Sequence, residues 1–112
     1  MADNDIIKFI RSCIKRRKVL WSYHVNMRLK ERFITRGDIL SSLDTFEIIE
    51  EYPKDKYLPS YLIYAKNKKD QIFHIQIAVD IDNDSVTIIT AYKPNFEKWD
   101  KDFKTRRSHD LP

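Results

Sequence analysis

The chain has 112 residues, a formal net charge of +4 at pH 7 and one cysteine. This length suits one domain with one core, and no stretch approaches the roughly 18 consecutive apolar residues of a membrane-spanning helix. The N-terminal residues also lack the basic and long apolar regions of a secretory signal. We therefore expect a single cytoplasmic domain over residues 1–112 with no membrane partner, in which Cys13 is a buried thiol.

Positive charge is concentrated at the start of the chain. Residues 1–32 carry nine lysines and arginines against three acidic residues, so their excess of positive charge is larger than that of the whole protein. An uneven charge of this kind attracts nucleic acid or an acidic protein partner. The alternative interpretation is an ordinary solvated helix face.

Three helices are predicted before residue 44. The first is a basic helix within residues 1–18, capped by Asp3 or Asn4 and amphipathic. The second runs from Ser22 to about Arg32 and has an apolar row at i, i+4 spacing. The four members of this row are Trp21, Val25, Leu29 and Phe33. The third is a short helix that begins at the capping-box sequence from Thr35 to Asp38.

After residue 44 the spacing of apolar residues becomes that of strands. Strands are predicted over residues 46–52, 61–65, 72–80 and 86–92, and their short connections favour an antiparallel meander. Asn95 then caps a short C-terminal helix whose shared face is Phe96, Trp99 and Phe103, and residues 104–112 form a flexible polar tail. The predicted fold is α+β, with three N-terminal helices packed on a four-stranded antiparallel sheet.

The third predicted strand carries the histidine of greatest interest. Alternation places Phe73, Ile75, Ile77 and Val79 in the core, which leaves His74 on the opposite, solvent or ligand face of the sheet. Either Thr90 and Tyr92 or Thr87 and Ile89 share that face, because the register of the last strand is not fixed by the pattern. His74 is otherwise an ordinary residue of an exposed face.

A second group of candidate residues lies on the second helix. His24, Arg28 and Arg32 form one i, i+4, i+8 row beside its apolar row. Arginine there suits phosphate, since its guanidinium is a fork of donors. The plainer alternative is that both arginines pair with nearby carboxylates, such as that of Glu31, while His24 packs beside Trp21.

The residue pattern also limits the chemistry. One cysteine and isolated histidines give no zinc spacing, and Gly37, the only glycine, excludes a glycine-rich phosphate loop. We therefore expect no metal and no cofactor. A ribonuclease without a metal needs an acid, a base and cations. Catalytic candidates are His24, His74 and Tyr92, and candidates for holding RNA phosphates are Arg28, Arg32, Lys93, Arg106 and Arg107.

Several motifs follow one another along most of the chain. They are the row His24, Arg28 and Arg32, then Ile34-Thr35 with Asp38-Ile39, Glu47 to Pro53, His74 with Ala78-Val79-Asp80, Ile88 to Tyr92, Trp99 and Arg106-Arg107. Together these motifs resemble the prokaryotic family called domain of unknown function 4258. Members look similar to RelE-like and barnase-like toxins. Phe46 departs from the family pattern, which tends to have a small residue there.

The resemblance implies an endoribonuclease toxin that cleaves mRNA, free or on the ribosome, and a small antitoxin protein as its partner. Two other interpretations remain open. One is a non-catalytic module that binds RNA or protein through the basic helical surface. The other is an assembly domain that meets its partner through Phe96, Trp99 and Phe103. His24 and His74 share one site only if the sheet curves enough to bring them together.

Overall fold

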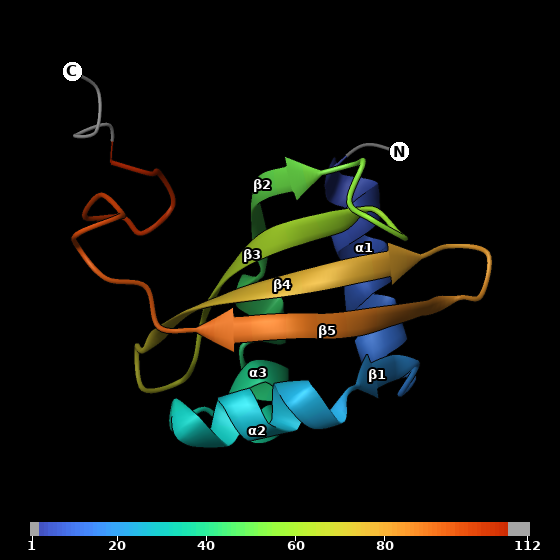
Figure 1. Cartoon of the computed structure of the whole chain (residues 1–112), viewed down its shortest axis with the longest axis horizontal. Helices are drawn as coiled ribbons and strands as arrows, with labels where there is room; N and C mark the ends of the chain where they lie inside the picture. The colour runs from blue at the N-terminus through green and yellow to red at the C-terminus, as the bar shows by residue number, and fades with distance from the viewer. Residues whose placement is uncertain (1–2, 108–112) are drawn as a thin grey trace.

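A five-stranded sheet organises the fold (Figure 1). The computed structural model describes residues 3–107. In chain order the elements are α1 (Asp3–Lys15), β1 (Val19–Trp21), α2 (Tyr23–Glu31), α3 (Arg36–Ser41), a 3₁₀ turn (Leu43–Thr45), β2 (Glu47–Tyr52), β3 (Ser60–Lys66), β4 (Ile72–Asp80) and β5 (Ser85–Tyr92). Among the described residues, no helix combines the length and the apolar character needed to cross a membrane.

The sheet is mixed, with the strand order β1-β5-β4-β3-β2. Strands β2 to β5 form the expected antiparallel meander, but β1 pairs in parallel with β5, Val19 opposite Val86 and Trp21 opposite Ile88. The prediction of a four-stranded antiparallel sheet is therefore wrong. A three-residue strand has too few side chains for a recognisable alternation, and its partner lies far along the chain.

The starts of α2 and α3 are set by side chains that cap them. The Ser22 hydroxyl accepts a hydrogen bond of 3.0 Å from the backbone N–H of Val25. Thr35 and Asp38 form the predicted capping box, with reciprocal bonds of 2.9 Å. The predicted apolar row of α2 is only half right, because Trp21 belongs to β1 and Phe33 is 85% exposed. Phe33 follows the helix in a left-handed conformation, φ 56°, which turns its side chain away from the core.

The core lies between the helices and one face of the sheet. Figure 1 shows α1 behind the strands, where Ile6, Ile10 and Ile14 are buried against the sheet. The predicted core residues of β4 are all buried, and so is Cys13. Each fully buried isoleucine contributes about 1.5–3 kcal/mol, so this layer is the main source of stability.

The C-terminal segment is not the predicted helix. The Asn95 side chain does accept bonds from the N–H groups of Glu97 and Lys98, but the chain forms only a turn there and no helix follows. Asp102 binds the next amides, those of Lys104 and Thr105, and Asn and Asp side chains that bind nearby amides compete with helix formation. An isolated pairing of Trp99 with Arg106 then folds the segment back on itself.

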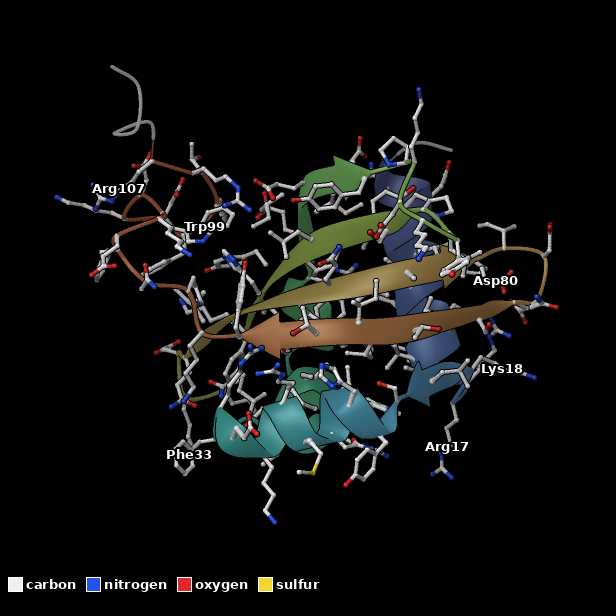
Figure 2. All side chains as sticks on the ribbon, in the orientation of Figure 1. Arg17, Lys18, Phe33, Asp80, Trp99 and Arg107 are labelled. Atoms are coloured by element: carbon white, nitrogen blue, oxygen red, sulfur yellow. The ribbon has the colours of Figure 1, made fainter. Side chains whose placement is uncertain are left out.

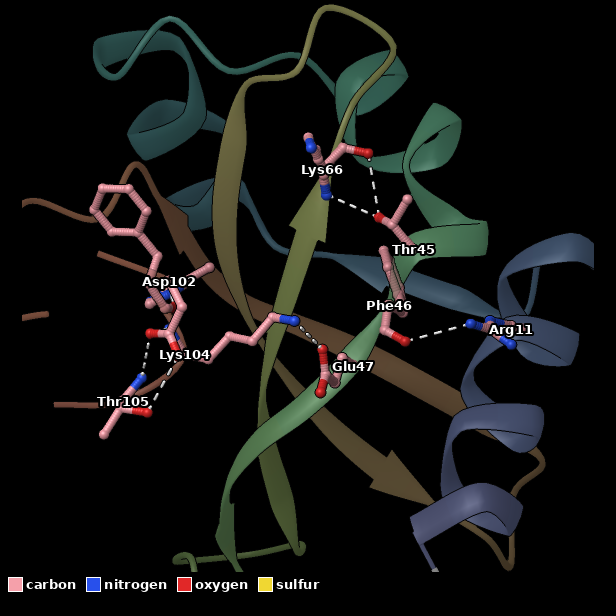
Figure 3. A network of polar contacts seen from close by, with 10 residues as sticks. Arg11, Thr45, Phe46, Glu47, Lys66, Asp102, Lys104 and Thr105 are labelled. Carbon is pink, nitrogen blue, oxygen red and sulfur yellow. Dashed lines mark hydrogen bonds and ion pairs between the residues drawn. The ribbon is translucent and has the colours of Figure 1, made fainter. Parts of the chain in front are cut away.

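This segment lies over the second face of the sheet. Lys104 forms an ion pair of 2.8 Å with Glu47 of β2, which Figure 3 shows from close by. Arg106 pairs with Glu50 of the same strand. Residues 104–107 of the predicted flexible tail are thus attached to the sheet, and residues 108–112 lie outside the described residues. The sheet is covered on both faces at this end.

Candidate functional site

A pocket of about 350 Å³ opens where β5 ends and the C-terminal segment turns over the sheet. We call it the β5 pocket. Its lining is Arg32, Tyr92, Lys93, Pro94, Asn95, Lys98, Trp99 and Arg106. Four of these residues are candidates from the sequence, so the fold brings together Arg32, Tyr92, Lys93 and Arg106 from α2, β5 and the C-terminal segment.

Arg32 enters the pocket from the end of α2. Its Nη1 donates to the backbone carbonyl of Ala91 at 2.8 Å and to the Thr90 hydroxyl at 3.0 Å. Both acceptors are neutral, so they fix the guanidinium without cancelling its charge. The contact also covers the edge of β5 beyond Ile88, where β1 no longer pairs with it. Arg32 therefore both closes the sheet edge and brings positive charge to the pocket.

Tyr92 lies on the same face of the sheet as His74. The two residues are opposite each other in the β4–β5 pairing, and a bulge between Gln76 and Ile77 shifts the register further along. The Tyr92 hydroxyl lies 3.2 Å from His74 Nδ1. Because of the bulge, both Thr87 and Thr90 also pair with residues of the His74 face. Each of the two registers considered for the last strand is therefore correct for part of it, one before the bulge and the other after it.

His74 is fully buried, not exposed as the alternation of β4 predicts. Trp99 packs its ring against the imidazole edge-on, with the centroids 4.3 Å apart, and the Phe103 carbonyl lies 2.5 Å from Nε2. A carbonyl can only accept, so Nε2 carries the proton and Nδ1 accepts from the Tyr92 hydroxyl. His74 therefore holds Tyr92 in place from beneath the pocket.

The neutral form of His74 is the stable one in this setting. Burial lowers the pKa of the imidazole below its usual value, although the Phe103 carbonyl and the Glu50 carboxylate oppose this shift. Burial also raises the pKa of Tyr92, so the phenol keeps its proton at neutral pH. At neutral pH the neutral Tyr92 hydroxyl therefore donates to the neutral His74 imidazole.

Arg106 forms the wall of the pocket on the side of β2. Its Nη2 donates to Glu50 at 3.0 Å and its guanidinium stacks over Trp99, 4.6 Å from the ring centroid. Glu50 also accepts a short hydrogen bond from the Tyr52 hydroxyl. Despite partial burial, the bonds from Arg106 and Tyr52 lower the pKa of the Glu50 carboxyl. The charge of Arg106 is largely balanced, so its main role is to hold Trp99 over His74.

His74 should make the protein less stable in mild acid. Its pKa is lower in the folded state than in the unfolded chain, so below a pH of about 6.5 the unfolded state binds more protons and unfolding becomes easier. We expect the free energy of unfolding to fall between pH 7 and pH 5, by at most about 1.4 kcal/mol per pH unit. Glu50 acts in the same direction, but only below a pH of about 4.5, because its pKa is lowered.

Urea unfolding of wild type and His74→Gln across this pH range measures the effect. The glutamine variant is less stable at pH 7, but its stability should change less between pH 7 and pH 5. Equal pH slopes for the two proteins would contradict the assignment.

The remaining candidate residues do not line the β5 pocket. His24 is exposed on α2 and accepts a bond of 3.5 Å from Arg28 Nε, while Arg28 lies 3.8 Å from Glu31. This agrees with the plainer interpretation of Arg28. Arg107 donates to the Trp99 carbonyl at 2.9 Å. His24 contacts its own helix, whereas His74 contacts β5 and the C-terminal segment, so the two histidines do not form an acid–base pair.

Two important residues of the site are absent from the sequence-based candidates. Lys98 lines the β5 pocket, and Trp99 covers His74 rather than forming a helix face. Their places depend on how residues 94–107 fold back on the sheet, which the local pattern does not reveal. The sequence does place Lys98 and Trp99 close to Arg106-Arg107 in a basic C-terminal stretch. This proximity was the one sign that they belong to the same site.

The chain folds as a small α+β domain, and four cationic side chains line its β5 pocket. The chain belongs to the family described as Domain of unknown function (DUF4258), whose model matches residues 21–93. The match includes Arg32, His74, Tyr92 and Lys93, and it ends before Lys98, Trp99 and Arg106. No curated protein and no solved structure matches the chain, so the resemblance to RelE-like toxins is not confirmed.

Proposed function

We propose that this protein binds RNA phosphates in the β5 pocket and cleaves the strand there without a metal ion, as a toxin-like endoribonuclease. The observation that carries the proposal is the placement of Arg32, Lys93 and Lys98 around Tyr92. Within residues 3–107 none of these three cations has a salt-bridge partner. Clustered cations beside a protic side chain suit a phosphodiester that gains charge as it reacts.

The reaction assigned to this site is attack of the ribose 2′-oxygen on the adjacent phosphorus. As the new P–O bond forms, the 2′-hydroxyl proton passes to the Tyr92 oxygen, and Tyr92 passes its own proton to His74 Nδ1. The bond to the 5′-oxygen breaks, and this oxygen takes a proton from the ammonium group of Lys93 or Lys98. Arg32 stabilises the phosphorane. His74 never touches RNA and acts through Tyr92.

Phe96 supports RNA as the ligand rather than a small phosphate. It is 58% exposed and lies between the pocket residues Asn95 and Lys98. The ring packs against Phe103, with the centroids 4.7 Å apart, which limits its motion. An exposed aromatic ring beside a cationic pocket suits single-stranded RNA, because an unpaired base stacks on it. The proposal also includes the cytoplasm as the compartment, mRNA on or off the ribosome as the substrate, and a small antitoxin as the protein partner.

Charge reversal at the pocket tests the binding step. In the variant Lys93→Glu/Lys98→Glu, we expect affinity for a labelled single-stranded RNA to fall at least tenfold, and the slope of log Kd against log salt to decrease by about 2. The control Lys54→Glu/Lys56→Glu has the same net charge but changes the loop between β2 and β3, and should stay within threefold of wild type. Equal binding by the two variants would overturn the proposed site.

Binding without cleavage is the second candidate function. It is favoured by the complete burial of His74, because among residues 3–107 no histidine lines the pocket where RNA would bind. Incubation of wild type with mRNA in EDTA, with and without ribosomes, separates the two candidates. Bound but intact RNA in both conditions would support the binding module, whereas cleavage that survives EDTA would support the endoribonuclease.

A further inference from the structure

A second groove lies at the other end of β5, beside β1. Its volume is about 460 Å³, and we call it the β1 groove. It is lined by Ile14, Lys15, Arg17, Val19, Trp21, Arg36 and Leu40, from α1, β1, α3 and the α1–β1 connection. It shares no lining residue with the β5 pocket.

The β1 groove combines an apolar floor with a positive rim. Ile14 is buried at its base and Leu40 is 45% exposed beside it. The rim cations are Lys15, Arg17 and Arg36, and none of the acidic side chains that the structure describes lines the groove. Arg36 donates to the neutral Asn26 amide oxygen at 2.8 Å, so its charge is not cancelled. Figure 2 shows Arg17 pointing away from the sheet at this edge.

The groove also includes the edge of the sheet. β1 is the first strand in the order β1-β5-β4-β3-β2, so within the described residues one of its sides has no strand neighbour. Leu20, at its centre, is 60% exposed. The edge of a sheet offers backbone donors and acceptors to another extended chain. Here those groups run beside the apolar floor and the three cations.

We infer that the β1 groove binds an extended acidic segment of a partner protein. The segment adds to the outer edge of β1 as a sixth strand, because backbone pairing supplies affinity and alternate side chains supply specificity. Aliphatic side chains on one side of it meet Ile14 and Leu40, and carboxylates meet the rim cations. This inference does not depend on the function proposed for the β5 pocket.

The groove fits this partner better than it fits RNA or a second copy. Arg36 stacks on Trp21, 4.8 Å from its ring centroid, which blocks that ring face as a platform for a base. The opposite edge strand, β2, does carry glutamates that a second copy would need. However, Glu47 and Glu50 are already paired with Lys104 and Arg106, so self-association through them would cost two ion pairs.

The test uses the full chain and a labelled octapeptide of alternating valine and glutamate, with an alternating valine–lysine peptide as its control. Fluorescence anisotropy should show binding of the acidic peptide only. We expect Lys15→Glu/Arg36→Glu to weaken it at least tenfold and Leu40→Asp at least fivefold. Lys68→Glu/Lys69→Glu, the charge-matched control in the β3–β4 turn, should stay within twofold. Thermal unfolding confirms that each variant is folded.

Hydrogen exchange distinguishes strand addition from simple charge attraction. The outward-facing amides of Val19 and Trp21 should exchange at least tenfold more slowly with the peptide bound, whereas those of the β3–β4 turn should not change. Three results would overturn the inference: no binding by wild type, equal binding by the reversed and control variants, or no added protection of β1. It would also fail if oligouridylate displaced the peptide from the groove, or if sedimentation showed a dimer that Lys15→Glu/Arg36→Glu abolished.

Discussion

Replacing Tyr92 by phenylalanine should slow RNA cleavage by about 10²–10⁴-fold while leaving RNA binding nearly intact. The change removes one oxygen from the β5 pocket and keeps the ring, the charges and the backbone. Burial raises the pKa of Tyr92, so the phenol takes a substrate proton only by giving its own to His74, 3.2 Å away. Without the oxygen this transfer has no path. Proton transfer by a positioned side chain typically contributes 10²–10⁴-fold to the rate, and we expect a loss in about that range.

Single-turnover cleavage and RNA affinity, measured on the same preparations, check this result. The affinity of Tyr92→Phe should stay within about threefold of wild type. Its folded state should lose about 1 kcal/mol, the value of one hydrogen bond. Tyr57→Phe is the matched control, since Tyr57 is 84% exposed in the loop between β2 and β3, and its cleavage rate should not change. If Tyr92→Phe kept more than a tenth of the wild-type rate, the proposed chemistry would be wrong even with RNA bound.

Those parts of the fold that depend on neighbouring residues could be predicted from the sequence. Ser22, Thr35 and Asp38 mark the starts of α2 and α3 through bonds within one turn. The alternation in β4 identifies its core face, because hairpin partners are close along the chain. By contrast, β1 forms only because it pairs with β5. Its three residues are too few to show the alternation that would predict a strand.

The sequence predicted several residues of the candidate site but not how they are placed relative to one another. Four of the eight candidate residues meet in the β5 pocket, because they lie at the ends of elements that converge there. His24 shares a helix row with Arg32, yet only Arg32, at the end of α2, reaches β5. The burial of His74 depends on residues 99–103, and their conformation is decided by contact with the sheet rather than by their own pattern.

Replacing Trp99 by alanine should have the largest effect on stability of the changes considered. Trp99 is 3% exposed and contacts three residues. Its ring packs on His74, the Arg106 guanidinium stacks on the same ring, and its backbone carbonyl accepts a hydrogen bond from Arg107. Removing a buried tryptophan side chain typically costs about 3–5 kcal/mol. We expect a loss of about 3 kcal/mol, the lower end of this range, because Trp99 lies in a segment outside the helices and the sheet strands, which can partly collapse.

The same variant should free His74 from its cover. With the indole removed, water reaches the imidazole, and the pKa that burial had lowered should rise toward the ordinary value. The histidine signal in an NMR titration would shift accordingly, and the loss of stability between pH 7 and pH 5 would shrink. RNA binding should weaken as well, since the neighbouring residue Lys98 lines the β5 pocket.

Phe96→Ala is the control that makes this prediction specific. Phe96 is an aromatic residue of the same segment but is 58% exposed, so its removal should cost less than about 1 kcal/mol and leave the His74 titration unchanged. Trp99→Phe, which keeps an aromatic cover over the imidazole, should fall between the two. If Trp99→Ala cost no more than Phe96→Ala, the C-terminal segment would not be part of the folded core. His74 would then lie open to solvent, and both its low pKa and its role behind Tyr92 would have to be abandoned.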